Sequence, residues 1–147
     1  MCTKLYFFIN NLNQDKWNHV AWVKTGANNI LYINGMVSGI WTTSATSYIY
    51  TNYTIGFIDN YFSGNIDEVR FWTKKLTADE ISKNWNKPLT GNEADLQLYY
   101  NFNNQGYATE NNTNVKFIKD ITANNKKGIF SNLSLSGSQQ NFVTDIA

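Results

Sequence analysis

The chain has 147 residues, with 12 basic and 11 acidic side chains, 16% aromatic residues, one proline, one cysteine and one histidine. This length suits a single domain that buries its own core, and the balanced charge excludes the basic stripe of a dedicated nucleic-acid surface. One cysteine and one histidine exclude the usual zinc patterns and a disulfide framework, and no apolar run reaches the roughly 18 residues of a membrane-spanning helix.

The first elements predicted along the chain are β-strands. Residues 3–10 are strand-like, and the alternating polarity of residues 20–24 predicts a second strand. A turn over residues 26–29 leads into a further strand at residues 30–33. The Asn-Gly dipeptide at residues 34–35 then marks a tight turn, because this pair is the strongest short-range hairpin signal.

One short helix is predicted, from the residue after Thr77 to Trp85. Thr77 suits the N-cap and Glu80 its capping-box partner, while Leu76 and Ile81 occupy the positions of a hydrophobic staple. Ile81 and Trp85 are four residues apart and form one inward-facing apolar stripe. A proline and a glycine soon afterwards end the helix. We expect it to pack as a clip on a sheet.

We predict one domain over residues 1–147, with residues 95–147 as its strand-rich tail. No internal repeat is evident. The polar stretch at residues 103–114 is predicted to be a mobile loop, because such tracts bury too little apolar surface to become ordered. The strand-like segments of the tail are residues 96–102, 128–135 and 141–146.

An ordered set of motifs runs through the chain: W-x-H-V-A, L-Y-I-N-G, I-G, F-x-G-x-I-D-E-V-R-x-W and L-x-x-x-E-I. Together they resemble the laminin G-like domains of the concanavalin A-like jelly-roll superfamily. The resemblance covers roughly residues 17–88 and implies an all-β fold, an antiparallel jelly-roll β-sandwich, here with one short helix. The motif residues are Trp17, His19, Val20, Ala21, Leu31, Tyr32, Ile33, Asn34, Gly35, Ile55, Gly56, Phe62, Gly64, Ile66, Asp67, Glu68, Val69, Arg70, Trp72, Leu76, Glu80 and Ile81.

The front of the jelly roll is short in this sequence. Laminin G-like domains usually have several strands before W-x-H-V-A, and only residues 3–10 precede it here. Inner-face residues such as Val20, Trp22, Val69 and Phe71 would then be partly uncovered, which is costly. We predict that the tail packs back as strands of the same sandwich. The alternative is that a second copy of the chain covers the gap, which would make the protein an obligate homo-oligomer.

Asp67 and Glu68 raise the alternative of a glycoside hydrolase, because the same superfamily includes laminarinase-type enzymes. Those enzymes resemble one another in an E-x-D-x-E run, whose acids share one face of a strand and flank the glycosidic bond. In this sequence the stretch is Asn-Ile-Asp-Glu-Val, and since alternate residues share a face, Asp67 and Glu68 point opposite ways. We therefore predict that the chain is not an enzyme. A structural turn and cross-strand ion pairing are predicted for Asp67, Glu68 and Arg70.

Calcium is the one cofactor that the resemblance suggests. Pentraxins share the I-G then G-x-I order and carry metal ligands in the loop after I-G, which here is residues 57–61. This loop offers Asp59 and Asn60, whereas calcium takes about six to eight oxygen donors. A plain Asx turn at these two residues is the alternative.

A sugar site needs aromatic faces together with amide or other polar groups in a shallow groove. Residues 39–53 supply aromatic side chains among small polar ones, and Tyr48 and Tyr50 share one face of a strand as a platform. For each aromatic residue, core packing is the alternative. Core positions are predicted for the motif tryptophans Trp17, Trp22, Trp72 and Trp85. The aromatic residues of the segment are Trp41, Tyr48, Tyr50 and Tyr53, and the candidate ligand-binding residues are Trp41, Tyr48, Tyr50, Asn60 and Tyr61.

These expectations combine into a non-catalytic recognition module, carbohydrate-binding and lectin-like or adhesive, whose partner is a glycan or a protein surface. A structural or protein-interaction module of a larger extracellular protein is the alternative, and a glycoside hydrolase is a remote one. His19 is predicted to orient a neighbouring loop rather than to act as a base. A Tyr-Tyr-Asn-Phe segment followed by an Asp-Ile-Thr-Ala-Asn-Asn turn resembles the extension that trails such domains in bacterial surface proteins, which implies an extracellular or cell-surface location.

Overall fold

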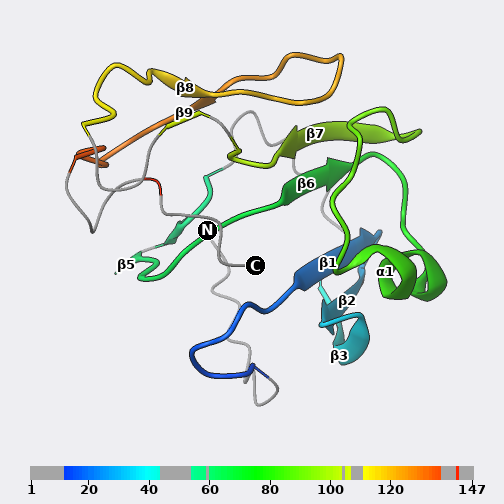
Figure 1. Cartoon of the computed structure of the whole chain (residues 1–147). Coiled ribbons are helices and arrows are strands. Elements are labelled where there is room, and N and C mark those ends of the chain that lie inside the picture. Colours follow the sequence, from blue (N-terminus) through cyan, green and yellow to red (C-terminus); the bar gives the residue numbers. More distant parts are fainter. Residues whose placement is uncertain are drawn as a thin grey trace. The chain divides into compact units, whose positions relative to one another are not determined.

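The structure is a computed structural model that describes residues 12–43, 54–58, 60–103, 105–106, 111–136 and 142, with the backbone alone at residues 57, 58, 60 and 61. The chain divides into two compact units: Met1–Tyr48 with Lys75–Lys87, and Ile49–Lys74 with Pro88–Ala147. We call them the first and the second unit. The described elements, shown in Figure 1, are β1 Val20–Thr25, β2 Asn28–Ile33, β3 Met36–Thr42, β4 Phe57–Ile58, β5 Asn60–Tyr61, β6 Val69–Trp72, α1 Ala78–Asn84, β7 Leu96–Tyr100, β8 Phe117–Ile118 and β9 Gly128–Ile129.

The strands pair in antiparallel fashion throughout the described residues. The first unit holds a three-stranded sheet in the order β1-β2-β3, and the second unit holds the two-stranded pairs β4-β5, β6-β7 and β8-β9. This mainly β structure with one short helix confirms the predicted class.

The turn between β2 and β3 is the one predicted from the Asn-Gly pair. Asn34 and Gly35 have φ angles of +49° and +80°, and two positive φ angles in succession are what a two-residue type I′ hairpin requires. Trp85 packs closely against this turn, since a Cβ at Gly35 would lie 2.6 Å from Trp85 Cδ1. A residue with a side chain at position 35 would therefore displace the indole.

The turn between β1 and β2 is shorter than predicted, because Asn28 and Asn29 already belong to β2. Asn29 is fully buried, yet its side chain has partners: Nδ2 donates to the Ala27 carbonyl at 2.9 Å and to the Thr43 hydroxyl at 3.2 Å. Its Oδ1 accepts a hydrogen bond from Trp22 Nε1 at 3.1 Å. A buried amide with its partners in place is tolerated inside a strand, so a residue typical of turns extends the sheet here.

Helix α1 begins as the sequence predicts. The Thr77 hydroxyl accepts a hydrogen bond from the Glu80 backbone N–H at 3.2 Å, and the Glu80 carboxylate accepts one from the Thr77 N–H at 2.8 Å. Both bonds of a capping box are therefore present, and two of the unpaired N–H groups at the helix start are satisfied.

One face of the three-stranded sheet packs against α1. Residues that pair directly across strands share a face, so Ala21 lies beside Tyr32 and Val23 beside Ile30. Ile81 of α1 is only 3% exposed and joins this face. The buried cluster consists of Val23, Tyr32 and Ile81, with Ala21, Ile30 and Leu76 partly buried around it. The helix is thus a packed clip, as expected.

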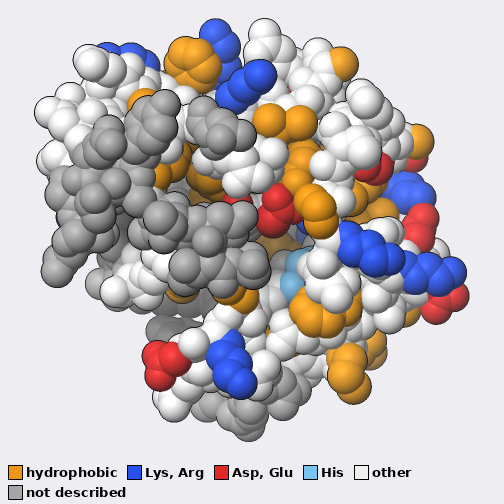
Figure 2. Space-filling model, in the orientation of Figure 1, with side chains coloured by type: hydrophobic (Ala, Val, Ile, Leu, Met, Phe, Trp, Pro, Cys, Tyr) orange, Lys and Arg blue, Asp and Glu red, His pale blue; other side chains and the backbone are white. Residues whose placement is uncertain are grey.

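The opposite face of this sheet is exposed along β1 and buried along β2. Trp22 and Val20 are 59% and 53% exposed, whereas their partners Leu31 and Ile33 are buried. Trp17, which precedes β1, is also exposed. The prediction that Trp17 and Trp22 belong to the core is therefore wrong: Trp22 lies on the face away from α1 and is held there by the bond from its ring N–H to Asn29. Figure 2 shows, on the side drawn, that hydrophobic side chains lie at the surface among polar ones.

In the second unit, a strand of the tail pairs with a strand of the family motif. β7 lies antiparallel to β6, with Val69 opposite Tyr100 and Arg70 opposite Tyr99 (Figure 1). Leu96, Tyr99 and Tyr100 of β7 are buried. Of the three strand-like tail segments, the first forms β7, the second contributes only the two residues of β9, and the third lies almost wholly outside the described residues.

The polar stretch at residues 103–114 is described only in part, and its described end is packed. Asn112 is buried, and its backbone N–H donates to the Leu135 carbonyl at 2.8 Å. A backbone hydrogen bond to a distant segment gives this part of the tract the order that its composition does not provide.

Candidate functional site

Asp67 and Glu68 lie immediately before β6 rather than within it. Glu68 has a φ of +54°, so the alternation of strand faces does not apply to this pair. Asp67 Oδ1 accepts the Glu68 N–H at 2.8 Å, and the Glu68 carboxylate forms an ion pair with Arg70. This ion pair joins residues two positions apart on one segment, whereas the prediction had placed the pairing across strands.

The cross-strand partner of Glu68 is the hydroxyl of Tyr99, which donates to both carboxylate oxygens at 2.7 and 2.8 Å. The same hydroxyl accepts the Leu89 N–H at 3.3 Å, and the Arg70 guanidinium lies 5.6 Å from the centre of the Tyr99 ring. Burial, followed by the hydrogen bond to Glu68, raises the pKa of Tyr99 to about 12. Tyr99 therefore remains a hydrogen-bond donor, and Glu68 is held as an acceptor in a structural network.

Asp120 fastens a loop of the tail onto β7. Its carboxylate accepts the backbone N–H groups of Tyr99, Thr122 and Lys126 at 3.0, 3.0 and 2.9 Å, together with the Thr122 hydroxyl at 2.9 Å. Burial alone would raise the pKa of Asp120, but these hydrogen bonds outweigh it and lower the pKa below the ordinary value. Asp120 is thus a buried anion that joins the two parts of the extension noticed in the sequence.

The described residues of the predicted sugar site belong to two different units. Trp41 lies half-buried in β3 of the first unit. Asn60 and Tyr61 form β5 in the second unit, where only their backbone is described. Tyr48, Tyr50, Tyr53 and Asp59 lie outside the described residues. The predicted ligand set remains a prediction.

No group of three or more His, Cys, Asp or Glu side chains within the described part of the chain could hold a metal ion. This statement does not cover the two predicted calcium ligands. Asp59 lies outside the described residues, and only the backbone of Asn60 is described. Calcium at these residues remains a prediction.

The backbone of His19 contacts the hairpin turn, and the predicted role of its side chain in orienting a neighbouring loop stays a prediction. Its backbone N–H donates to Asn34 Oδ1 at 2.8 Å, and its carbonyl accepts the Asn34 N–H at 2.9 Å. The imidazole lies 6.4 Å from the Trp85 ring, at an angle of 53°. These contacts give His19 a structural role next to β1.

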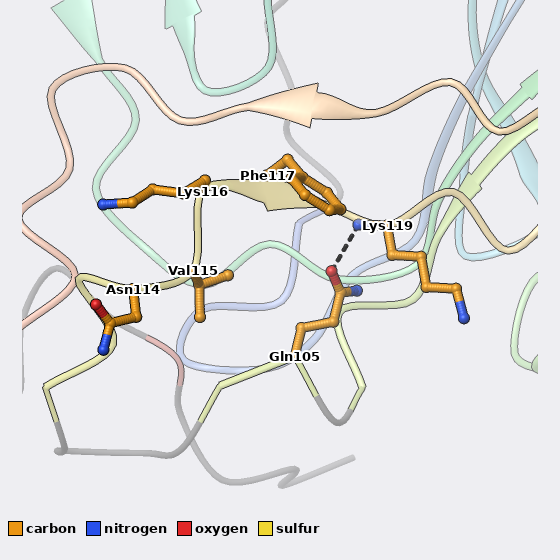
Figure 3. A pocket seen from close by; sticks show the side chains of 6 residues that line it. All are labelled: Gln105, Asn114, Val115, Lys116, Phe117 and Lys119. Carbon is orange, nitrogen blue, oxygen red and sulfur yellow. Dashed lines mark hydrogen bonds between the residues drawn. The ribbon is translucent and has the colours of Figure 1, made fainter.

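A pocket of about 240 Å³ in the second unit was not predicted from the sequence (Figure 3). It combines the aromatic ring of Phe117, which is 42% exposed, with two amide and two lysine side chains. The backbone N–H of Lys119 donates to Gln105 Oε1 at 2.6 Å and joins two segments of the pocket wall. The lining residues are Gln105, Asn114, Val115, Lys116, Phe117 and Lys119.

The signal for this pocket in the sequence is weak. Lys116 and Lys119 belong to a short run, Lys-Phe-Ile-Lys, that follows the polar tract and resembles an ordinary half-exposed strand. Gln105 lies 14 positions before Lys119, inside the tract predicted to be mobile. Within the described residues, the hydrogen bond between them joins the two segments.

The described residues combine antiparallel β-strands, one short helix and an open pocket that contains an aromatic ring, amides and lysines, which are features found in binding modules. The family comparison agrees: a laminin G family model described as "Concanavalin A-like lectin/glucanases superfamily" matches residues 9–82, half of the chain. The chain therefore belongs to the concanavalin A-like lectin/glucanase superfamily, and laminin G-like domains are generally non-catalytic binding modules. The match confirms the resemblance noted in the sequence and begins eight residues earlier, before residue 17.

Among solved structures, the chain is similar to residues 221–444 of an S-layer domain-containing protein from Clostridium thermocellum ATCC 27405. The identity is 29%, the TM-score is 0.38, and the match covers 50% of this chain and 41% of that one. This chain thus spans about two fifths of the length of that structure. A comparison with curated proteins finds no match. Within the described residues, no helix has the length and apolarity needed to cross a membrane.

Proposed function

We propose that this chain is a non-catalytic carbohydrate-binding module, built as a jelly-roll β-sandwich and displayed outside the cell or on its surface as part of a larger protein. Membership of a lectin/glucanase superfamily supports two kinds of activity, sugar binding and sugar hydrolysis. The choice between them depends on the carboxylates of the family motif.

The observation that carries the proposal is that the Glu68 carboxylate is already bonded to Tyr99 and Arg70. A retaining or inverting glycosidase needs two carboxyl groups that face the scissile bond, one of them able to give and take a proton. Glu68 instead accepts the Tyr99 O–H, shared between its two carboxylate oxygens, and pairs with Arg70, while Asp67 accepts the Glu68 N–H. An acid held by a buried tyrosine and an arginine is suited to stabilising the β6-β7 pair rather than to proton transfer.

The test is a glycan array probed with the purified chain, once with calcium and once with a chelator. We expect binding to at least one class of glycan and no release of reducing sugar from β-glucans, galactans or xylans. Loss of binding with the chelator would support the calcium site at Asp59 and Asn60. Turnover that disappears in Asp67→Asn or Glu68→Gln would overturn the proposal in favour of a hydrolase.

A protein-interaction module is the second candidate, and one observation favours it. β3 is an outer strand of the three-stranded sheet in the described structure, and its Met36 and Ile40 are 75% and 70% exposed. An exposed apolar outer strand can add a strand from another chain. An array without any bound glycan, together with a protein partner whose binding is lost in Ile40→Lys, would favour this candidate.

A further inference from the structure

The pocket in the second unit is cationic. Two of its six lining residues, Lys116 and Lys119, are lysines, and none of the six is acidic. Figure 3 shows the two lysine side chains extending in opposite directions from the same short segment, and Lys116 Nζ donates one hydrogen bond to the Thr113 carbonyl at 2.7 Å. A concave site bordered by charges of one sign raises the local concentration of ligands with the opposite sign.

A third lysine lies against the aromatic ring of this site. Lys127 Nζ is 4.3 Å from the centre of the Phe117 ring, close enough for a cation–π interaction. This ammonium covers part of the ring that a neutral sugar would otherwise use for stacking. The nearest acid in the sequence is Asp120, beside Lys119. Its carboxylate is buried and bonded to Tyr99, Thr122 and Lys126, so it does not line the pocket.

The pocket also contains an oriented hydrogen-bond donor. The bond from the Lys119 N–H to Gln105 Oε1 fixes which end of the Gln105 amide is the acceptor. Gln105 Nε2 is buried and has no hydrogen-bond partner among the described residues. A buried donor left without a partner costs free energy, and an acceptor oxygen on a ligand in the pocket would satisfy it.

The size of the pocket limits the ligand to a small group. Drug-sized ligands occupy pockets of about 300–1,000 Å³, and this one is somewhat smaller at about 240 Å³. It therefore fits one residue of a longer, extended molecule. A ring with several hydroxyl oxygens and one anionic group matches an amide donor, flanking ammonium groups and a partly covered aromatic ring.

We propose that this pocket binds an anionic saccharide residue, one that carries a carboxylate or a sulfate group, within a polysaccharide. This inference rests on the proposed carbohydrate-binding function and names the class of sugar. The anionic group pairs with Lys116 or Lys119, and a ring or carboxylate oxygen accepts the free N–H of Gln105.

The test is calorimetric titration of the full chain with oligogalacturonate and with its methyl ester, which has the same rings without the charge. We expect the acid to bind and the ester to bind at least about tenfold more weakly, as loss of a charge-assisted contact predicts. Dextran sulfate, compared with dextran, tests sulfate as the source of the negative charge. Binding to either anionic sugar, and not to its neutral counterpart, supports the proposal.

Variants locate the binding. Gln105→Glu keeps the oxygen that accepts the Lys119 N–H and replaces the free N–H₂ with a negative oxygen, so we expect at least about tenfold weaker binding of the anionic sugar. The double variant Lys116→Gln, Lys119→Gln should show a similar loss, whereas Lys75→Gln, an exposed lysine of the first unit, should bind as the natural chain does.

Three outcomes would overturn the inference. Equal binding of oligogalacturonate and its methyl ester, or unchanged binding in Gln105→Glu, would show that the pocket does not recognise the negative charge. Equal binding of polyglutamate or single-stranded DNA would show that charge alone is recognised rather than a sugar. If neutral glycans bind on the array and neither anionic sugar does, the inference fails while the proposed function stands. If no glycan binds on the array, the inference and the proposed function both fail.

Discussion

At the scale of single residues, the described structure depends on buried polar groups whose partners come from distant segments. Asn29 is tolerated inside β2 because Ala27, Thr43 and Trp22 supply its hydrogen bonds. Asp120 is held in the same way by backbone N–H groups of the tail. A buried polar side chain is stable only while its partners stay in place, so such residues are sensitive points.

The first residue-scale prediction concerns Asp120→Asn. The substitution removes one acceptor oxygen and the negative charge, so we expect the free energy of unfolding at pH 7 to fall by about 1–3 kcal/mol. Because the folded-state pKa of Asp120 is lowered, its stabilisation is present above the unfolded pKa and is lost as the pH falls through the folded value. The difference between the natural chain and the variant should therefore narrow below about pH 4.

Urea unfolding at several pH values measures this difference. Asp15→Asn is the matched control, since Asp15 is exposed and also has a positive φ that asparagine accepts. It should change the stability by less than about 0.5 kcal/mol. A constant difference between the natural chain and Asp120→Asn from pH 7 down to pH 2 would contradict the assignment of Asp120 as a stabilising buried anion.

The candidate site shows which residue-scale features the sequence could reveal. The position of His19 beside the hairpin turn follows from the order of the W-x-H-V-A and L-Y-I-N-G motifs, and its bonds to Asn34 are made by its backbone. The role of Glu68 was predicted only in outline, since its positive φ and its bond to Tyr99, 31 positions later, are not local properties. The pocket depends on a contact across 14 positions, and no periodicity signals such a contact.

At the scale of elements, local chemistry was a good guide wherever two or more local signals agreed. The Asn-Gly pair gave the turn at residues 34–35, and the capping box placed the start of α1. Elements of two residues, such as β8 and β9, have too short a pattern to be predicted. The first turn was predicted too long, because Asn28 and Asn29 extend β2 and the buried side chain of Asn29 has its hydrogen-bond partners there.

The element-scale prediction tests whether α1 is a packed clip. Ile81 is buried against Val23 and Tyr32, and Leu76 is partly buried at the edge of the same cluster. Ile81→Ala should lower the free energy of unfolding by about 2–5 kcal/mol, because it leaves a cavity in that cluster. Leu76→Ala should cost about 2 kcal/mol, at the low end of that range.

Chemical denaturation measures both variants, with Ser82→Ala as the control. Ser82 follows Ile81 on the exposed side of α1, so this substitution should change the stability by less than about 0.5 kcal/mol. If Ile81→Ala costs no more than Ser82→Ala, the helix is not packed on the sheet.

At the scale of the whole molecule, the question is what completes the fold beyond the family segment. The family match ends at residue 82, whereas β6, inside it, pairs with β7 of the tail. The tail also supplies Tyr99, which bonds to Glu68, and Asp95, whose carbonyl accepts the Thr73 N–H at 2.9 Å. Residues on both sides of the family boundary thus share one set of hydrogen bonds within the second unit.

The last prediction follows from this shared pairing: removal of residues 95–147 should abolish soluble folding. Without β7, strand β6 would expose a row of unpaired backbone groups, and the Glu68–Arg70 pair would lose the hydroxyl of Tyr99.

The measurement is the circular dichroism and solubility of the shortened chain, together with sedimentation of the intact chain. We expect the intact chain to be a stable monomer at micromolar concentration, because its own tail supplies β7, the strand that pairs with β6. A soluble, folded shortened chain would contradict the role of the tail. A dimer that unfolds on dilution would instead support a second copy of the chain as the covering partner, since the stability of such a dimer depends on its concentration.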